Sequence, residues 1–482
     1  MKVLFASSEI APYASTGGLG EVSRSLPAAL GRAGVDVVRI MPLYRHVTAS
    51  GRQLEDTGLR LRIPVGFRMM VAEIYRHDLN GITTYFVGRD EYFDRRELYA
   101  LPHREYTDNF ERFVFFQKAV VALIDAAALA PDIVHGNDWT CGLIPMYLRH
   151  GINGMGRNGH EGTVFTVHNL AYQGIYPASE FPLSNLPFSC FSIAGLEFYG
   201  KINCLKGGLT SSLVSTTVSP SYADEIRQPE LGMGLDGVLR SLGDRFIGIR
   251  NGVDTDIWNP AIDPLIEARY SADNAEGKGI CKRSLMAEAG FAGDDDVPLV
   301  AMISRLEDEK GLDLLAEVMP EIMSRPLQMV ILGRGAQKYE GLCVEWMRRW
   351  PNRFHAWIGY NEALAHRIQS AADIYLMPSR LEPCGLSHLY ALKYGALPIV
   401  RSTGGLKDSV QALSDDTTTG NGVVFTGLTG AALLEALDRG LAIRKSGAWS
   451  ALQRRLMLED HSWEKPVTEY QRVYNAVFAS PR

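Results

Sequence analysis

The four residues Thr-Gly-Gly-Leu occur twice in the chain, at positions 16–19 and 403–406. The first copy follows the apolar run Lys2–Ala6, and the second follows Ala396–Val400. Short apolar runs of this kind indicate buried strands. A glycine-rich turn between a strand and a helix leaves backbone amides open to a ligand. Two such turns, near opposite ends of the chain, predict two similar α/β domains that face one another.

The chain length agrees with two domains. At 482 residues the chain is too long for a single core. A turn at 250–254 follows the predicted strand Phe246–Ile249, and the stretch after it has no strong periodicity. We therefore expect a first domain over residues 1–250 and a second over 251–460. A last helix within 461–482 is expected to cross the domain junction.

Composition excludes several classes of protein. Hydrophobic residues make up 46% and charged residues 22% of the chain, as in soluble globular proteins. A net charge of −6 argues against a nucleic-acid surface. The six cysteines form no CxxC pair, which favours reduced thiols and a cytoplasmic protein. The N-terminus is typical of a first strand and not of a signal peptide, and no apolar run is long enough to span a membrane.

The stretch 374–395 combines a strand, a charged loop and a helix. Ile374–Pro378 is the predicted strand, and Gly385 begins a helix that Gly395 ends. Free amides and the helix dipole at such an N-terminus attract an anion. The carboxylate of Glu382, just before it, is suited to accept hydrogen bonds from sugar hydroxyls. The alternative is an ordinary strand–helix unit of an α/β core.

Other polar residues follow predicted strands in the first domain. Asp138 follows the strand 132–135, and His168 and Asn169 follow the strand 163–167. Ligands of open α/β sheets bind at the carboxyl ends of strands, so these are candidate site residues. Asp138 could instead cap a helix, and His168 could be a hydrogen-bonded histidine at a strand end.

Two cations follow the predicted strand 298–303 of the second domain. Arg305 and Lys310 precede a helix that begins at Leu312, an arrangement suited to a diphosphate. The alternative is a solvated charged loop, because the acidic residues 307–309 lie between the two cations. Further along, Tyr360 is the last residue of the predicted strand 354–360 and could offer its ring to a base.

The remaining pattern predicts alternating strands and helices. It includes a hairpin around Asn80-Gly81 and a long amphipathic helix over Asn109–Ala130. Further strands are predicted at 35–42, 215–220 and 328–332, and a final helix over Trp463–Phe478.

The chain resembles the bacterial glycogen synthase and plant starch synthase family over essentially its whole length. Seven motifs in matching order carry the resemblance: residues 16–19, 135–139, 167–174, 251–254, 304–312, 378–386 and 403–406. Members of this family are retaining glucosyltransferases that use ADP-glucose. The resemblance implies the GT-B fold, with two facing Rossmann-like domains and a deep interdomain cleft that closes during reaction.

The resemblance also implies residue roles. Arg305 and Lys310 would neutralise the donor diphosphate, and Glu382 would hold the glucose hydroxyls. The distal phosphate would bind the amides at the helix start, and Tyr360 would face the adenine. From the first domain and the junction, Asp138, His168 and Asn251 would contact the glucose. The catalytic set is thus His168, Arg305, Lys310, Glu382 and Asp138; the substrate-binding set is Ser15, Gly17, Gly18, Asn251, Tyr360, Cys384, Gly385, Leu386 and Ser387.

Two positions depart from the family pattern. Ser15 stands where relatives have a lysine that contacts the donor, and Glu21 stands where bacterial members usually have aspartate. The loss of a cation at Ser15 puts donor affinity and nucleotide preference in question. Arg24, one turn into the helix, is an alternative source of positive charge.

The implied reaction transfers glucose from ADP-glucose to an α-1,4-glucan such as glycogen, with no metal or other cofactor. Three alternatives remain open from the sequence. One is a related GT-B transferase that uses UDP-glucose or another acceptor. Another is a paralogue that binds glucan but has lost donor turnover, against which the joint presence of His168, Arg305, Lys310 and Glu382 argues. A phosphorylase is a weaker alternative, because no pyridoxal-phosphate lysine is evident.

Overall fold

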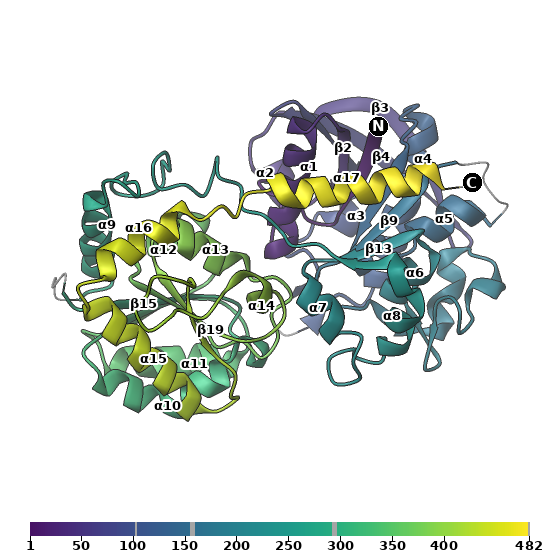
Figure 1. Cartoon of the computed structure of the whole chain (residues 1–482). Helices are drawn as coiled ribbons and strands as arrows, with labels where there is room; N and C mark the ends of the chain where they lie inside the picture. The colour runs from purple at the N-terminus through teal and green to yellow at the C-terminus, as the bar shows by residue number, and fades with distance from the viewer. Residues whose placement is uncertain (102–103, 155–159, 292–295, 481–482) are drawn as a thin grey trace. The chain divides into compact units, whose positions relative to one another are not determined.

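A computed structural model of the chain describes residues 1–101, 104–154, 160–291 and 296–480 (Figure 1). The chain forms two compact units. One comprises Met1–Asn251 together with Trp463–Arg482, and the other comprises Gly252–Ser462. The chain therefore leaves the first unit within one residue of the predicted boundary. Its last helix belongs to the first unit.

The N-terminal unit is built on a nine-stranded sheet with the order β14-β13-β9-β8-β1-β2-β5-β4-β3. The strands from β14 to β5 are parallel, whereas β4 and β3 continue the sheet in antiparallel fashion. This parallel sheet with helical connections confirms the predicted α/β class. The strand bounds are β1 Lys2–Ala6, β2 Asp36–Pro42, β3 Glu55–Val65, β4 Arg68–Leu79, β5 Ile82–Gly88, β8 Ile133–Asn137, β9 Gly162–Val167, β13 Val214–Thr217 and β14 Phe246–Gly248.

Helices and short strands complete this unit. A three-stranded sheet, β10-β12-β11, and the pair β6-β7 lie apart from the main sheet. The helices are α1 Gly18–Arg32, α2 Arg45–Ala49, α3 Asp90–Phe93, α4 Asn109–Ala126, α5 Ile144–His150, α6 Cys204–Ser211, α7 Pro220–Glu225, α8 Asp236–Leu242 and α17 Glu464–Ala479. The short strands are β6 Ala100–Leu101, β7 Arg104–Glu105, β10 Ile175–Pro177, β11 Glu197–Phe198 and β12 Lys201–Asn203.

The predicted hairpin is confirmed, and one predicted helix is corrected. Asn80 and Gly81 join β4 to β5, with φ angles of 53° and 78° that suit a tight hairpin turn. Helix α4, in contrast, ends at Ala126 rather than Ala130. Ala128 has a φ of 48°, which lies outside the right-handed helical region, so the helix cannot continue through it. The helix is also buried on nearly all sides, so the predicted amphipathic character was wrong.

The last helix, α17, packs against the N-terminal unit (Figure 1, yellow). It contacts β8, β9 and α1. The hydroxyl of Tyr474 lies 2.8 Å from Nδ1 of the buried His135 on β8. The other ring nitrogen, Nε2, lies 2.6 Å from the Thr166 hydroxyl on β9. The helix is therefore joined to the sheet core by both apolar packing and a buried hydrogen-bond chain.

The C-terminal unit contains a six-stranded, fully parallel sheet with the order β17-β16-β15-β18-β19-β20. The strands are β15 Leu299–Ile303, β16 Gln328–Gly333, β17 Phe354–Ile358, β18 Ile374–Met377, β19 Leu397–Arg401 and β20 Val423–Phe425. The helices are α9 Glu276–Glu288, α10 Leu312–Ser324, α11 Gln337–Arg349, α12 Glu362–Ala371, α13 Leu386–Lys393, α14 Gly405–Ser409, α15 Gly430–Lys445 and α16 Trp449–Leu458. Each unit is thus Rossmann-like, as predicted.

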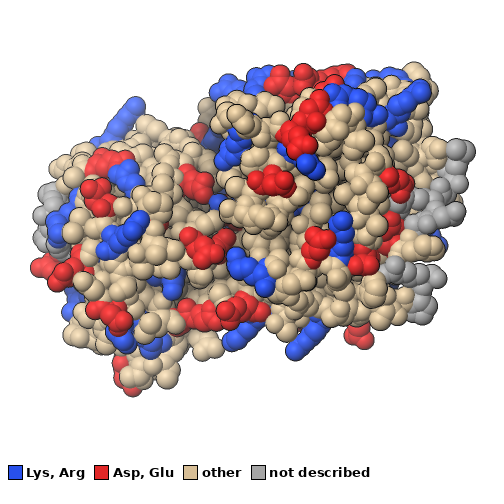
Figure 2. All heavy atoms as spheres, turned by 90° about the horizontal axis from the view of Figure 1, so that it is seen from above, with Lys and Arg blue, Asp and Glu red and all other residues tan. Residues whose placement is uncertain are grey.

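Figure 2 shows acidic and basic side chains interspersed over the face that it draws. Five of the cysteines, at 141, 190, 204, 281 and 343, are buried free thiols. Among the described helices, none combines the length and the apolar composition needed to cross a membrane.

Candidate active site

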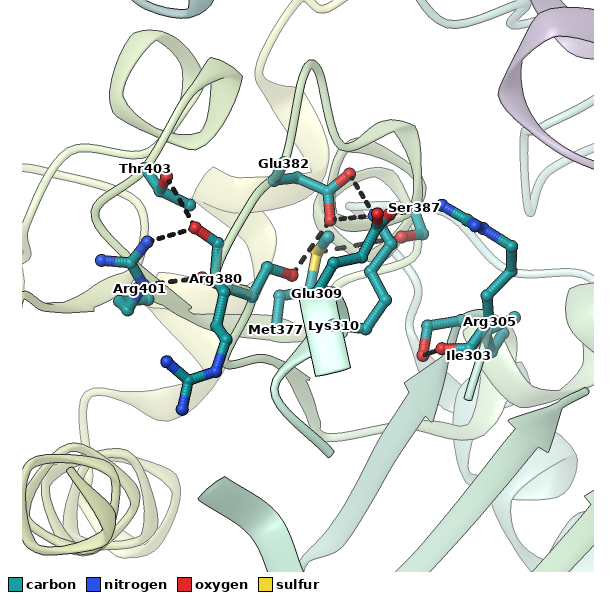
Figure 3. Close-up of polar contacts among 12 residues, drawn as sticks. Ile303, Arg305, Glu309, Lys310, Met377, Arg380, Glu382, Ser387, Arg401 and Thr403 are labelled. Atoms are coloured by element: carbon teal, nitrogen blue, oxygen red, sulfur yellow. Dashed lines mark hydrogen bonds and ion pairs between the residues drawn. The ribbon is translucent and has the colours of Figure 1, made fainter. Parts of the chain in front are cut away.

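The C-terminal unit gathers Arg305, Lys310 and Glu382 on loops that follow neighbouring strands (Figure 3). In the sheet, β18 lies between β15 and β19, so the loops that leave these three strands are adjacent. The loop after β15 carries Arg305 and Lys310, and the loop after β18 carries Glu382. This is the edge of a parallel sheet where ligands bind.

Gly311 allows the first two loops to pack directly on one another. Its φ is 76°, and a Cβ at this position would stand 2.1 Å from the carbonyl oxygen of Pro378. A side chain at residue 311 would therefore push the two loops apart. The residue next to it, Lys310, is placed against the loop that carries Glu382.

Lys310 and Glu382 form a partly buried ion pair. Nζ of Lys310 lies 3.0 and 2.9 Å from the two carboxylate oxygens of Glu382. The two side chains are only 12% and 8% exposed. The Ser379 hydroxyl donates a third hydrogen bond to the same carboxylate at 3.0 Å. The Glu382 carboxylate is therefore fixed in place by three contacts, and Figure 3 shows it beside Lys310.

Arg305 has a carboxylate neighbour of its own. Its Nη2 donates to Oε1 of Glu309, and the same oxygen lies 3.6 Å from Nζ of Lys310. The loop is therefore not simply a solvated charged segment. Sequence reasoning missed Glu309 as a member of this cluster, because the residue stands within an acidic run.

Two further contacts hold the Glu382 loop from β19, and the sequence did not reveal them. Arg401, the last residue of β19, donates to the carbonyl oxygens of Ser379 and Arg380, each at 2.6 Å. Just beyond, the second Thr-Gly-Gly-Leu turn approaches the same loop. A Cβ on Gly405 would stand 2.6 Å from backbone atoms of Cys384, so this approach requires glycine.

Helix α13 begins where the sequence predicted an anion site. Gly385 is its N-cap residue with a φ of 80°, and Leu386 and Ser387 form its first turn. The carbonyl of Ser387 accepts from the Gln369 side chain at 3.0 Å, while Cys384 is half-buried. Tyr360 follows β17, the strand at one edge of the sheet, and the residue is 65% exposed.

In the N-terminal unit, the first Thr-Gly-Gly-Leu turn is held by Glu9. The buried Glu9 carboxylate accepts from the Thr16 amide at 2.5 Å and from the Thr16 hydroxyl at 2.8 Å. Tyr99 donates a further hydrogen bond to it at 2.7 Å. Gly17 is the N-cap of α1 and Gly18 its first residue. Glu9 thus organises the turn, a role that its position in the sequence did not indicate.

Ser15 lies at the start of this turn. Its hydroxyl donates to the carbonyl of Gly17 at 3.2 Å, and its side chain packs so closely on Gly20 that a Cβ there would clash. Arg24, the alternative cation, contacts the carboxylate of Glu21. The charge of Arg24 is therefore already opposed by a neighbouring acid.

Asp138 and His168 are brought together at the ends of β8 and β9. The backbone amide of His168 donates to Oδ1 of Asp138 at 2.7 Å, and the His168 ring Nε2 lies 2.9 Å from Oδ1 of Asn137. Asp138 adopts a φ of 55°, an uncommon conformation for a residue with a side chain. The alternative role of Asp138 as a helix cap is not found, because its side chain makes no capping hydrogen bond to the short helix Trp139–Cys141 that follows it.

Burial changes the protonation of this pair. Desolvation raises the pKa of Asp138 to about 7, although backbone amides of His168 and Asn169 oppose the change. Desolvation lowers the pKa of His168 to about 3, so the imidazole is neutral near pH 7. Perturbed groups of this kind occur often at functional sites.

Asn251 is the last residue of the N-terminal unit and is buried. In the described part of the chain its side-chain oxygen Oδ1 has no hydrogen-bond partner. Within the same ranges, no group of three or more His, Cys, Asp or Glu side chains is arranged to hold a metal ion.

Comparison with known proteins places these features in a class. Residues 2–241 match the family model of the starch synthase catalytic domain, and residues 288–447 match that of the glycosyl transferases group 1. The chain superposes on the catalytic domain of starch synthase IV from Arabidopsis thaliana bound to ADP and acarbose, with a TM-score of 0.92 and 31% identity over 99% of each chain. A more distant likeness, to sucrose-phosphate synthase from Thermosynechococcus elongatus, has a TM-score of 0.62 over 100% of both chains at 18% identity and reflects the fold alone. The chain is a glycosyltransferase built from two Rossmann-like domains, the GT-B type.

Curated relatives narrow the class. The glycogen synthase of Syntrophotalea carbinolica is 39% identical over 98% of both chains. That of Anaeromyxobacter dehalogenans is 41% identical over 99% of this chain and 100% of the relative. The chain therefore belongs to the glycogen synthase family, which confirms the family resemblance drawn from its motifs.

Proposed function

We propose that this protein transfers glucose from ADP-glucose to the non-reducing end of an α-1,4-glucan, with retention of configuration and release of ADP. The observation that carries the proposal is the Lys310–Glu382 pair beside the N-terminus of α13. One cation for phosphate and one carboxylate for sugar hydroxyls lie within hydrogen-bond distance of each other. A nucleotide sugar carries a phosphate and sugar hydroxyls that are equally close to one another, so it could contact both side chains at once.

In this proposal the diphosphate is bound by Arg305, Lys310 and the amides of residues 385–387. Charge-assisted hydrogen bonds to phosphate are among the strongest that side chains make. The N-terminus of a helix adds open amides and a favourable dipole. As the anomeric C–O bond breaks, negative charge grows on the leaving phosphate, and these groups stabilise it.

Glu382 would accept hydrogen bonds from the glucose hydroxyls. Its carboxylate is already oriented by Lys310 and Ser379, so it needs no rearrangement to receive the sugar. Lys310 would then contact the diphosphate and Glu382 together. Cys384, Gly385, Leu386 and Ser387 would line the phosphate site, and Tyr360 would face the adenine.

For the N-terminal unit, we propose that Asp138 and His168 contact the transferred glucose and that Ser15, Gly17, Gly18 and Asn251 take part in substrate binding. Oδ1 of Asn137 is an acceptor, because the Asn137 amide nitrogen donates to Ala6. His168 Nε2 therefore carries the proton, and Nδ1 of the neutral ring is left as an acceptor for a sugar hydroxyl.

The proposed chemistry needs only the substrates and these side chains. A glucan 4-hydroxyl attacks the anomeric carbon from the face that the phosphate leaves, which retains the configuration. The departing phosphate oxygen takes the proton of that hydroxyl. The products are ADP and a glucan longer by one glucose.

Known relatives support the choice of substrates. The catalytic domain of starch synthase IV was solved with ADP and acarbose bound, and the presence of ADP favours an adenine nucleotide as the donor here. The curated relatives carry the name glycogen synthase, which favours glycogen as the acceptor. We also propose a cytoplasmic location, because five buried free thiols suit a reducing compartment.

The test compares radiolabelled ADP-glucose and UDP-glucose, with glycogen as acceptor. We expect label in glycogen chiefly from ADP-glucose, and α-linked product by NMR. Faster incorporation from UDP-glucose would overturn the donor assignment. Binding of glycogen without incorporation from either donor would favour a glucan-binding paralogue.

A further inference from the structure

Three acidic residues, 307–309, lie between Arg305 and Lys310, and their side chains differ in the partners that they contact. The Asp308 carboxylate pairs with Lys338 and Tyr339, away from the cluster. The Glu309 carboxylate pairs with Arg305 and approaches Lys310. The Glu307 side chain forms no ion pair within the described residues. One carboxylate of the three thus stands against both cations.

Glu309 is held in this position by its backbone as well as by its charge. Its carbonyl oxygen accepts from the amides of Arg380 and Leu381, at 2.8 and 3.2 Å. Its side chain is only 20% exposed. The residue therefore belongs to the loop packing around Glu382, and its carboxylate is partly shielded from solvent.

The charges in this cluster are balanced before any donor arrives. Arg305 pairs with Glu309, and Lys310 pairs with Glu382 at 2.9 Å. This separation is well below the Debye length of about 8 Å at physiological salt, so dissolved ions screen the pair only weakly. Glu382 has a proposed use in the reaction, as the group that holds the glucose hydroxyls. Glu309 has none, and its negative charge opposes the binding of a diphosphate.

We propose that Glu309 is a built-in competitor of the donor: it occupies Arg305 until the diphosphate displaces it, and it thereby sets the affinity for the nucleotide sugar. This inference rests on the proposed function, because it requires the diphosphate to bind at Arg305. It names Glu309 as an affinity-determining residue that does not itself touch the substrate during transfer.

A different role for Glu309 makes the opposite prediction. If the carboxylate served to hold Arg305 in the geometry that phosphate requires, its removal would weaken nucleotide binding. If it competes, its removal strengthens binding. The sign of a single measured change therefore separates the two roles.

The experiment measures ADP binding to the full-length protein by calorimetry. Glu309→Gln keeps the size of the side chain and leaves both backbone hydrogen bonds of residue 309 intact, so we expect it to fold. It removes the charge, and we expect the Kd for ADP to fall by roughly tenfold, as for the loss of one opposing charge near a phosphate. Glu307→Gln is the matched control, two residues away, and should leave the Kd unchanged.

A double variant ties the effect to Arg305. In an Arg305→Gln background, Glu309→Gln should improve ADP binding by no more than about twofold, because the directly paired cation is gone and the longer 3.6 Å approach to Lys310 contributes less. Glu309→Asp, which keeps the charge but shortens the side chain, should lie between wild type and Glu309→Gln. This series provides a second measurement should any one variant be unstable.

The outcomes are distinct. If wild type binds ADP and Glu309→Gln binds it equally or more weakly, the inference is wrong and the proposed function stands. An equal gain from Glu307→Gln would also overturn it, since the effect would then be a general change of surface charge. If wild type binds neither ADP nor UDP, the proposed function fails and the inference fails with it.

Discussion

The backbone amide of Gly405 donates a hydrogen bond to the carbonyl oxygen of Glu382 over 3.0 Å. These residues come from different strand–helix units, one after β18 and the other after β19. The second Thr-Gly-Gly-Leu turn therefore supports the loop that carries the proposed sugar-binding carboxylate. The glycine is required by this close approach, and the repeated motif acts here as a support for a neighbouring loop.

Gly405→Ala should disrupt this support. A Cβ at residue 405 would stand 2.6 Å from Cys384 Cα and 2.8 Å from the Pro383 carbonyl, so the loop must move. We expect the rate of glucose transfer to fall by about 100-fold, in line with misplaced catalytic groups. Gly447→Ala is the control, because a Cβ there meets nothing within 4 Å. Wild-type turnover in Gly405→Ala would show that the loop position is unimportant.

Glu382→Gln should abolish most transfer while the fold persists. The amide keeps the shape of the carboxylate but removes the negative charge that Lys310 and Ser379 orient. We expect kcat to fall by about 100-fold or more, since a neutral amide holds sugar hydroxyls less strongly. Turnover and a thermal melting curve are measured on the same preparation. Normal turnover with a normal melting curve would remove Glu382 from the site.

Asp138→Asn should change the dependence of stability on pH. Burial raises the pKa of Asp138 to about 7 from an ordinary value of 3.8, so the folded state holds its proton more strongly than the unfolded state does. The favourable contribution is complete below about pH 4 and is lost as the pH rises towards 7. Asparagine carries no such proton.

Melting temperatures at pH 5 and pH 8 check this prediction. We expect the wild-type melting temperature, relative to that of Asp138→Asn, to be lower at pH 8 than at pH 5. Taking the difference in melting temperature between the two proteins at each pH cancels the contribution of the other titrating groups, including His168. An identical pH dependence in both proteins would mean that Asp138 titrates normally in the fold.

Ser15→Lys should strengthen donor binding. The serine Cβ already packs against Gly20, and a lysine would differ only beyond that atom, towards the partly exposed side. A restored charge-assisted contact of about 1.4 kcal/mol would lower the KM for ADP-glucose by roughly tenfold. If the contact is equal in ground and transition states, kcat is unchanged. A donor KM that stays constant or rises would contradict the prediction and indicate a site rebuilt around serine.

Much of the fold could be predicted from local patterns. Buried parallel strands are short, apolar and bounded by turn residues, so β1, β9, β15 and β18 could be located to within a residue or two. The end of α4 could not, because Ala128 has a positive φ at a position that carries no glycine or proline. Its burial on all sides depends on long-range packing that no local period encodes.

Some residues of the candidate site could likewise be predicted from local patterns, and others could not. Arg305, Lys310 and Glu382 lie in motifs of adjacent residues, which made them visible in the sequence. Glu9 and Arg401 act through partners distant in sequence: Glu9 accepts from Tyr99, and Arg401 donates to Ser379. An isolated acid or arginine gives no sequence signal of such a contact. Their supporting roles required three-dimensional information.

The packing of α17 on β8 and β9 has a consequence for the order in which the protein folds during synthesis. The C-terminal unit, Gly252–Ser462, is an insertion between two parts of the N-terminal unit. Domains generally form from the N-terminus as the ribosome releases them. Here the second unit emerges whole while the first still lacks α17, so the hydrogen bond between His135 and Tyr474 cannot form until α17 has been synthesised. The unit that begins to form first is therefore completed only after the second unit has been synthesised.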